Sequence, residues 1–448
     1  MCRMPHATCA VLRRRRSGEV ARAPNTHEFE PTHAWLCATA PSHVVTATSH
    51  CAAGNQPRAM LSSADSRFPI PAMRAAPDIL SRVSRVIGCR HSVKECRRVS
   101  SLYFRSPRSC HRNYMSIEQL AETAQAMVAP GKGIIAIDES TSTIAKRFAS
   151  VGIENIEENR RAYRELLLTT PKLSDYISGA ILFDETIRQK TKDGVPFAEY
   201  MTAHGIIPGI KVDKGAQPLA GMPGELVTEG LDGLRARLEE YYTLGARFAK
   251  WRAVITIGED IPSGTCIEAN SHALARYAAL CQEQGLVPMV EPEVIMDGSH
   301  DIETCYEVTE ATLRSLFGAL YEQNVVLEGT ILKASMVISG KSCEEQASIE
   351  EVAESTVMCL KSTVPAILPG IVFLSGGQTD EQSTAHLNEM HQLGTLPWPL
   401  SFSYGRAMQQ AALKLWAKDM TVNFAKAQQV IYERAKENGL AALGKWKG

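Results

Sequence analysis

The sequence lacks any uncharged apolar run of about 18 residues, the length a helix needs to cross a bilayer. It also lacks the glycine repeat of collagen, the sustained heptads of a coiled coil and the depletion of apolar residues typical of disordered chains. The 448 residues are instead 44% hydrophobic and 22% charged. We therefore expect a globular protein with a sizeable core and no interaction with membranes.

The cysteines and histidines lack the spacings of metal-binding motifs, and no CxxC occurs. After residue 114 the five cysteines are scattered, which is typical of a reduced intracellular protein without a disulfide framework. We expect most of them to be small apolar core residues. The histidines in this part form no i, i+4 pair, and we expect each to be a surface or capping residue: His204, His272, His300, His386 and His391. No metal and no cofactor is predicted.

The net charge of −1 conceals two unlike segments. Residues 1–114 hold 18 basic and six acidic side chains and are interrupted by prolines, whereas the rest of the chain carries a charge of −13. The run Arg13–Arg16 is compatible with a nuclear or nucleic-acid patch, and an Arg-rich, acid-poor segment with an organelle transit peptide. No aromatic residues interleave with the arginines, so we predict no nucleic-acid binding. The favoured interpretation is a disordered leader or extension before a functional start at Met115, where Ser116 can cap a helix.

From residue 115 onward, eight short apolar runs alternate with amphipathic stretches. The predicted strands are 133–137, 177–183, 207–213, 248–255, 286–294, 327–337, 370–375 and 400–405. The predicted helices between them include 158–168, 230–244, 271–284, 306–322 and 348–362, and 407–442 is predicted as additional helix. Eight strand-helix units in one domain favour an α/β fold of the (β/α)8 TIM barrel type, with one domain over 115–448.

Charged residues interrupt several of these strands, although the strands of a parallel barrel are normally apolar. Three pairs are spaced by two, which places each pair on one face of its strand: Lys211 and Asp213, Lys250 and Arg252, and Glu291 and Glu293. Each residue alone could belong to an ion pair that closes the barrel. Together with Lys333, Asp138, Glu139 and the polar residues that follow strands seven and eight, they converge on the carboxyl end, where barrel active sites form. The excess of cations predicts a site for a phosphate.

These residues lie in seven segments that resemble the class I fructose-bisphosphate aldolases, in the order of that family. The segments are 136–141 (AIDEST), 209–214 (GIKVDK), 248–252 (FAKWR), 290–293 (VEPE), 327–333 (LEGTILK), 373–378 (FLSGGQ) and 402–406 (FSYGR). The resemblance covers essentially 115–448. It implies reversible cleavage of fructose 1,6-bisphosphate to dihydroxyacetone phosphate and glyceraldehyde 3-phosphate, a glycolytic reaction that proceeds through a lysine Schiff base.

The chemistry explains why such a site needs these groups. A protonated imine accepts the electron pair of the breaking carbon–carbon bond, and only an uncharged amine forms it. By resemblance, Lys333 forms the imine and Lys250 is the neighbouring cation that favours the neutral amine. Glu291 moves protons, Glu293 holds protons and lysines in place, and repulsion between the two is expected to raise one pKa. Asp138 contacts the substrate hydroxyls.

The two phosphates need separate anion sites. One is expected at Ser375, Gly376, Gly377, Gly405 and Arg406, because glycines let backbone N–H groups approach phosphate and the guanidinium matches its oxygens. The other is expected at Ser140, Thr143, Arg147, Lys211 and Arg252. By resemblance the partners are sugar phosphates, and the enzyme is a cytoplasmic homotetramer.

Other functions fit less well. Residues 374–378 also match the signature of transporter ATPases, but Ser335 stands where a P-loop before Gly340 needs glycine. Transaldolases and other imine-forming barrels share the lone strand lysine without the paired phosphate sites, and a non-catalytic scaffold would not need the intact catalytic set. Animal and plant relatives end in a tyrosine-bearing tail, whereas the last tyrosine here is Tyr432. A bacterial-type member with a short C-terminus is therefore expected, in which another acid or water protonates the carbanion.

Overall fold

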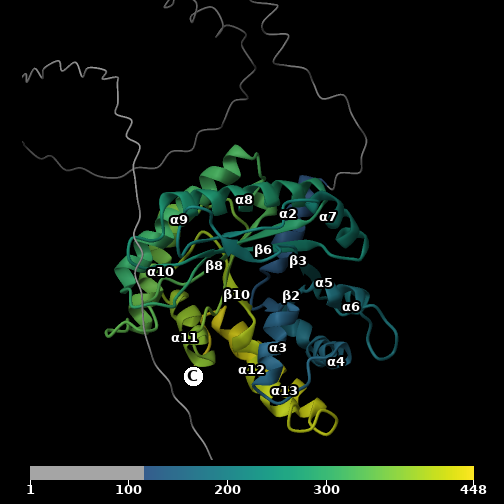
Figure 1. Ribbon diagram of the computed structural model, residues 1–448. Coiled ribbons are helices and arrows are strands. Elements are labelled where there is room, and N and C mark those ends of the chain that lie inside the picture. Colours follow the sequence, from purple (N-terminus) through teal and green to yellow (C-terminus); the bar gives the residue numbers. More distant parts are fainter. Residues whose placement is uncertain (1–115) are drawn as a thin grey trace, which may run out of the picture. The chain divides into compact units, whose positions relative to one another are not determined.

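The computed structural model describes residues 116–448, and these residues form a closed barrel of eight parallel strands surrounded by helices (Figure 1). The strand order around the barrel is β1-β10-β9-β8-β7-β6-β3-β2. The strands are β1 (Gly133–Ala136), β2 (Ile177–Leu182), β3 (Ile207–Lys211), β6 (Phe248–Ile255), β7 (Val287–Val294), β8 (Ile331–Ala334), β9 (Ile371–Phe373) and β10 (Leu400–Tyr404). The predicted (β/α)8 barrel and its eight strands are confirmed. The predictions for residues 1–114 lie outside the described residues.

Two local features differ from the predicted strands. The segment 327–337 was expected to be one strand, but β8 begins at Ile331 and Leu327–Gly329 forms a 3-10 turn, η3. A Cβ at Gly329 would lie 2.9 Å from the side chain of Leu120, so this turn packs closely on the first described helix. An antiparallel hairpin, β4 (Ala216–Pro218) with β5 (Leu226–Thr228), follows β3 and was not predicted.

The helices follow the expected alternation with the strands. They are α2 (Ile117–Met127), α3 (Thr141–Ala149), α4 (Glu157–Leu168), α5 (Asp184–Arg188), α6 (Phe197–Ala203), α7 (Leu234–Thr243), α8 (Gly264–Glu283), α9 (Ile302–Glu322), α10 (Ile349–Thr363), α11 (Asp380–Met390), α12 (Arg406–Trp416) and α13 (Phe424–Ala441). The predicted cap at Ser116 is confirmed, because its side chain accepts from the backbone of Gln119 in a capping box. The segment 407–442 divides into α12 and α13, which pack on each other (Figure 1).

Apolar side chains fill the amino-terminal half of the barrel, and α2 covers them. Leu120, Ala124 and Met127 from α2 join a buried cluster with residues from the strands, including Ile134 and Phe248. Gly209 makes room for this filling, since a Cβ there would lie 2.1 Å from the ring of Phe248. This half is therefore solid core, and any cavity must lie toward the carboxyl ends of the strands.

Among the described residues, the expectation for the cysteines is confirmed and the one for His386 is wrong. All five cysteines are free, and all except Cys343 are buried, as expected for small core residues. His386 is not a surface residue, because it is only 3% exposed and its Nδ1 lies 2.7 Å from Gln378 Oε1. Burial lowers the pKa of His386 to about 4, so the ring is neutral at pH 7. No helix within residues 116–448 is both long and apolar enough to cross a membrane.

Candidate active site

A cavity of about 1060 Å³ opens at the carboxyl ends of the barrel strands. Every predicted site residue except Gly377 lines it. From the strands and the turns after them come Asp138, Ser140, Lys211, Lys250, Arg252, Glu291, Glu293, Lys333, Ser375, Gly376 and Gly405, from α3 come Thr143 and Arg147, and from the start of α12 comes Arg406. The barrel thus brings together side chains that lie up to 268 positions apart in the sequence, from Asp138 to Arg406.

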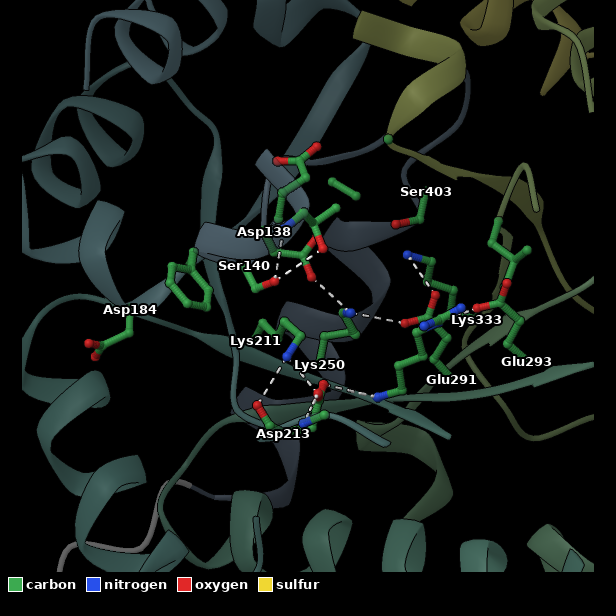
Figure 2. A pocket seen from close by; sticks show the side chains of 18 of the residues that line it. Asp138, Ser140, Asp184, Lys211, Asp213, Lys250, Glu291, Glu293, Lys333 and Ser403 are labelled. Atoms are coloured by element: carbon green, nitrogen blue, oxygen red, sulfur yellow. Dashed lines mark hydrogen bonds and ion pairs between the residues drawn. The ribbon is translucent and has the colours of Figure 1, made fainter. Parts of the chain in front are cut away.

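A chain of alternating charges crosses the floor of this cavity (Figure 2). Lys333 Nζ lies 3.0 Å from Glu291 Oε1, and the other oxygen of Glu291 lies 3.1 Å from Lys250 Nζ. Lys250 Nζ lies in turn 2.8 Å from Asp138 Oδ2. The side chains of the two lysines and of Glu291 are each no more than 5% exposed, so water screens these pairs weakly. Glu291 therefore lies between the two ammonium groups.

The pKa values in this chain follow from the pairing. Although burial opposes it, Lys250 and Lys333 hold the pKa of Asp138 below its usual range. Burial likewise opposes the shift at Lys250, but the carboxylates of Asp138 and Glu291 raise its pKa. The pKa of Glu291 is lowered by Lys250 and Lys333 against the effect of burial. The expectation that repulsion between Glu291 and Glu293 raises a pKa is therefore wrong for Glu291, because the two lysines outweigh it.

Glu293 is directed to a different partner from the one expected. It forms an ion pair with Arg252 Nε and not with a lysine. In the strand register Lys250 is opposite Met289 and Arg252 is opposite Glu291, so each cation contacts the carboxylate two residues further along β7. This diagonal arrangement separates Glu293 from the lysine chain and assigns it to Arg252.

Lys211, the last residue of β3, also has a carboxylate partner, two residues further along the chain. Its Nζ lies 2.5 Å from Asp213 Oδ1 and 3.0 Å from the Asp213 carbonyl oxygen. Asp213, which is 9% exposed, was noted in the sequence for its spacing but not proposed as a site residue. An ammonium has three donors, so Lys211 retains one for a ligand in the cavity.

Two glycines with positive φ shape the turn after β9. Gly376 has φ +59° and Gly377 has φ +152°, and the N–H groups of Gly377 and Gln378 both donate to the Ser375 carbonyl. Gly377 does not line the cavity. A Cβ at Gly377 would lie 2.6 Å from Lys341 Nζ, so this glycine shapes the turn and faces Lys341. Arg406 begins α12 directly after Gly405.

Four further residues line the mouth of the cavity and were missed in the sequence because they lie on helices beside the strand ends. Asp184 accepts hydrogen bonds from Tyr241 at 2.9 Å and from Arg188 at 2.9 Å. Arg188 also lies 2.6 Å from Glu240. Figure 2 shows Asp184 well apart from the lysine chain. A fifth missed residue, Ser403 on β10, is buried in the wall, and its hydroxyl has no partner within the described structure.

Metal ligands do not gather anywhere in the described part of the chain, where no three His, Cys, Asp or Glu side chains are arranged to hold an ion. The cavity instead offers cations to a ligand. Among its lining residues are Lys211, Lys214, Arg252 and Arg406, in addition to the two lysines of the central chain. A small anionic molecule fits this combination of size and charge.

Comparison with known proteins agrees with this geometry. A family model described as glycolytic fructose-bisphosphate aldolase class-I matches residues 119–448. A protein of Xanthomonas axonopodis pv. citri named "Probable fructose-bisphosphate aldolase class 1" is 99% identical over 334 residues, which are 75% of this chain and 100% of that protein. "Fructose-bisphosphate aldolase 5, cytosolic" of Arabidopsis thaliana is 55% identical over 74% of this chain and 92% of its own length.

A solved structure is similar over the same part of the chain. The fructose-bisphosphate aldolase of Plasmodium falciparum, solved in complex with TRAP and a small-molecule inhibitor, superposes with a TM-score of 0.73 at 49% sequence identity. The match covers 74% of this chain and 96% of the other. Family model, sequence relatives and structure agree, and the chain belongs to the class I fructose-bisphosphate aldolases.

Proposed function

We propose that Lys333 forms the Schiff base through which this aldolase works. Enzymes of the family are carbon–carbon lyases that cleave fructose 1,6-bisphosphate reversibly into dihydroxyacetone phosphate and glyceraldehyde 3-phosphate, and the chain shares that activity. The observation that carries the assignment is the unequal pairing of the two buried lysines. Lys250 has both Asp138 and Glu291 as partners, whereas Glu291 is the one carboxylate at ion-pair distance from Lys333 within residues 116–448. Lys333 therefore has one carboxylate partner fewer than Lys250, and we assign the imine to it.

The first steps place Glu291 in a proton-transfer role. Glu291 Oε1, 3.0 Å from Lys333 Nζ, takes a proton from the ammonium and leaves a nucleophilic amine. The amine nitrogen attacks the C2 carbonyl of the substrate, and the proton that this nitrogen loses passes to the oxygen to give a carbinolamine. Glu291 then returns its proton to this hydroxyl, which leaves as water while the nitrogen lone pair forms the protonated imine. No net proton is gained or lost by the site.

Cleavage of the carbon–carbon bond requires a second base. We assign this role to Asp138, which lies at the other end of the charged chain from Lys333. Asp138 takes the proton of the C4 hydroxyl, the C4–O bond becomes a carbonyl, and the C3–C4 electron pair moves into the imine to give an enamine. Glyceraldehyde 3-phosphate leaves. Lys250 lies 2.8 Å from Asp138, and its ion pairs keep it positively charged, so Asp138 stays ionised and ready to accept that proton. Protonation at C3 and hydrolysis of the imine release dihydroxyacetone phosphate and regenerate Lys333.

The two phosphates are assigned to the two sides of the cavity. Ser375, Gly376, Gly405 and Arg406 bind the phosphate of the dihydroxyacetone half, with Gly377 shaping the turn. The other phosphate is bound by a set on β3, β6 and α3: Ser140, Thr143, Arg147, Lys211 and Arg252. The free donor of Lys211 and the place of Ser375 and Gly376 in the cavity wall support this assignment.

Assembly and location follow from the family. We propose that the enzyme works in the cytoplasm, since an Arabidopsis relative at 55% identity is named cytosolic. A homotetramer is proposed by the same resemblance, and light scattering on the purified protein would test it. A single subunit or dimer in solution would contradict the tetramer.

Trapping tests the role of Lys333 directly. Borohydride reduction in the presence of dihydroxyacetone phosphate should fix the ligand to Lys333 as a secondary amine, detected by peptide mass spectrometry. The matched control is Lys333→Met, which should give no adduct. An adduct on Lys250 or Lys211 in the unsubstituted protein, or no adduct at all, would overturn the assignment.

A further inference from the structure

Glu139, the neighbour of Asp138, carries a buried charge that the proposed chemistry does not use. The residue is only 8% exposed, yet it follows β1 at the edge of the cavity. Its Oε2 accepts a hydrogen bond from Arg164 at 2.6 Å, and its Oε1 accepts one from Arg147. Arg164 is 2% exposed, so this pair is enclosed. Removing a carboxylate of this kind from its partners is costly, and its position is therefore well defined.

Gln409 ties the same carboxylate to the barrel. Its Nε2 donates to the carbonyl of Ala136 at 2.6 Å and to Glu139 Oε1 at 3.3 Å. Its Oε1 accepts a hydrogen bond from the buried hydroxyl of Tyr163 at 3.0 Å. The ring of Tyr163 packs edge-on against Phe148, whose neighbour in α3 is Arg147. Both the helix that carries Arg147 and the carboxylate that holds it are thus fixed by one buried network.

The guanidinium of Arg147 is held by Glu139 at the cavity wall. Nη1 binds Glu139, and the side chain of Arg147 lines the cavity and is 21% exposed. Arg147 lies one helical turn after Thr143 in α3, so both residues of the proposed second phosphate set are on the same face of that helix. One carboxylate shared by two arginines leaves a net positive charge, and Arg147 is the arginine of the two that reaches the cavity wall.

We propose that Glu139 is a positioning residue that orients Arg147 toward the second phosphate and thereby sets the preference for a bisphosphate over a monophosphate sugar. The proposal rests on the proposed binding of that phosphate by Arg147. Fructose 1-phosphate lacks the second phosphate, so it has no group for Arg147 to bind. Loss of Glu139 should therefore harm the two substrates unequally.

The test compares the kinetics of the full-length protein and Glu139→Gln with both substrates. For fructose 1,6-bisphosphate we expect KM to rise about tenfold with kcat nearly unchanged, since one charge-assisted contact is weakened. For fructose 1-phosphate both constants should stay within about twofold. The matched control is Glu185→Gln, which removes a carboxylate 2.6 Å from Arg160 but does not line the cavity, and should leave both substrates unaffected.

A double-mutant cycle separates positioning from a merely structural effect. In an Arg147→Ala background, Glu139→Gln should not change the ratio of kcat/KM for the two substrates any further, because Glu139 acts through Arg147. An equal loss for both substrates, an unchanged ratio, or a tighter KM for the bisphosphate in Glu139→Gln would overturn the proposal.

A second variant, which changes the network less, tests the proposal if Glu139→Gln does not fold. Gln409→Met removes one donor to Glu139 and should shift the same ratio by about threefold. An unchanged ratio there would also overturn the proposal. Failure of the aldolase assignment would look different, since the unsubstituted protein would then cleave neither substrate.

Discussion

Lys250→Met should destabilise the protein strongly at neutral pH. Lys250 is 3% exposed, and its ammonium lies 2.8 Å from Asp138 and 3.1 Å from Glu291. Removing one partner of a buried ion pair costs about 3–5 kcal/mol of unfolding free energy, because a charge is left uncompensated. Lys333 remains 3.0 Å from Glu291 and still neutralises it, so Asp138 carries most of the loss. We expect about 3 kcal/mol at pH 7, the lower end of that range.

The stability of Lys250→Met should also depend on pH in a defined direction. In the unsubstituted protein the pKa of Asp138 is lowered, so its contribution to stability is complete above the unfolded pKa and is lost only as the pH falls through the folded pKa. In Lys250→Met the main opposing cation is gone and burial should raise the folded pKa above the unfolded value of about 3.9. Stability then declines as the pH rises from the unfolded pKa to the folded pKa and is level above it. The variant should recover part of its lost stability between pH 8 and pH 5.

Urea unfolding at several pH values between 5 and 8, followed by circular dichroism, measures both effects. The control is Lys341→Met, which removes an ion pair with Asp297 in which the side chains are 39% and 71% exposed. Surface pairs contribute about 0–1 kcal/mol, so this variant should unfold almost like the unsubstituted protein at every pH. A loss for Lys250→Met that is no larger than the control, or that grows as the pH falls toward 5, would refute the reasoning.

Two further predictions concern the phosphate site and the first part of the chain. Arg406→Ala should raise KM for the bisphosphate roughly ten- to hundred-fold, since a charge-assisted hydrogen bond contributes about 1.5–3 kcal/mol, and an unchanged KM in steady-state assays would place Arg406 outside the site. A chain that starts at Met115 should keep the melting temperature and kcat/KM of the full chain, because the predicted strands and site residues all follow that methionine. A clear fall in either quantity would show that residues 1–114 contribute to the working enzyme.

The barrel could be predicted because its signals are local. Each strand is a short apolar run, and the polar residues that interrupt the runs mark the carboxyl ends. The error at the predicted strand 327–337 has a different origin. The 3-10 turn at Leu327–Gly329 packs on Leu120, which lies more than 200 residues earlier in the chain. A local hydrophobic pattern cannot predict a contact between such distant residues.

The site could be predicted by residue type but not by partner. The spacing of Lys250 and Arg252, and of Glu291 and Glu293, correctly placed all four at the cavity. It could not show that each cation contacts the carboxylate two residues further along the neighbouring strand. That offset depends on how long side chains lean along tilted barrel strands, which is a property of the assembled sheet. The wrong expectation for Glu293 and for the pKa of Glu291 follows from this one gap.

The buried network around Glu139 could not be predicted from the sequence. Its place beside Asp138 was visible, but its partners are not near it in sequence: Arg164 is 25 residues away and Gln409 is 270 residues away. An isolated glutamate at a strand end is equally compatible with a solvated surface residue, and only the enclosed arginine shows that the charge is buried. Buried polar networks of this kind are satisfied by contacts between distant segments. Their role in positioning a substrate-binding group therefore has to be read from the folded structure, and tested there.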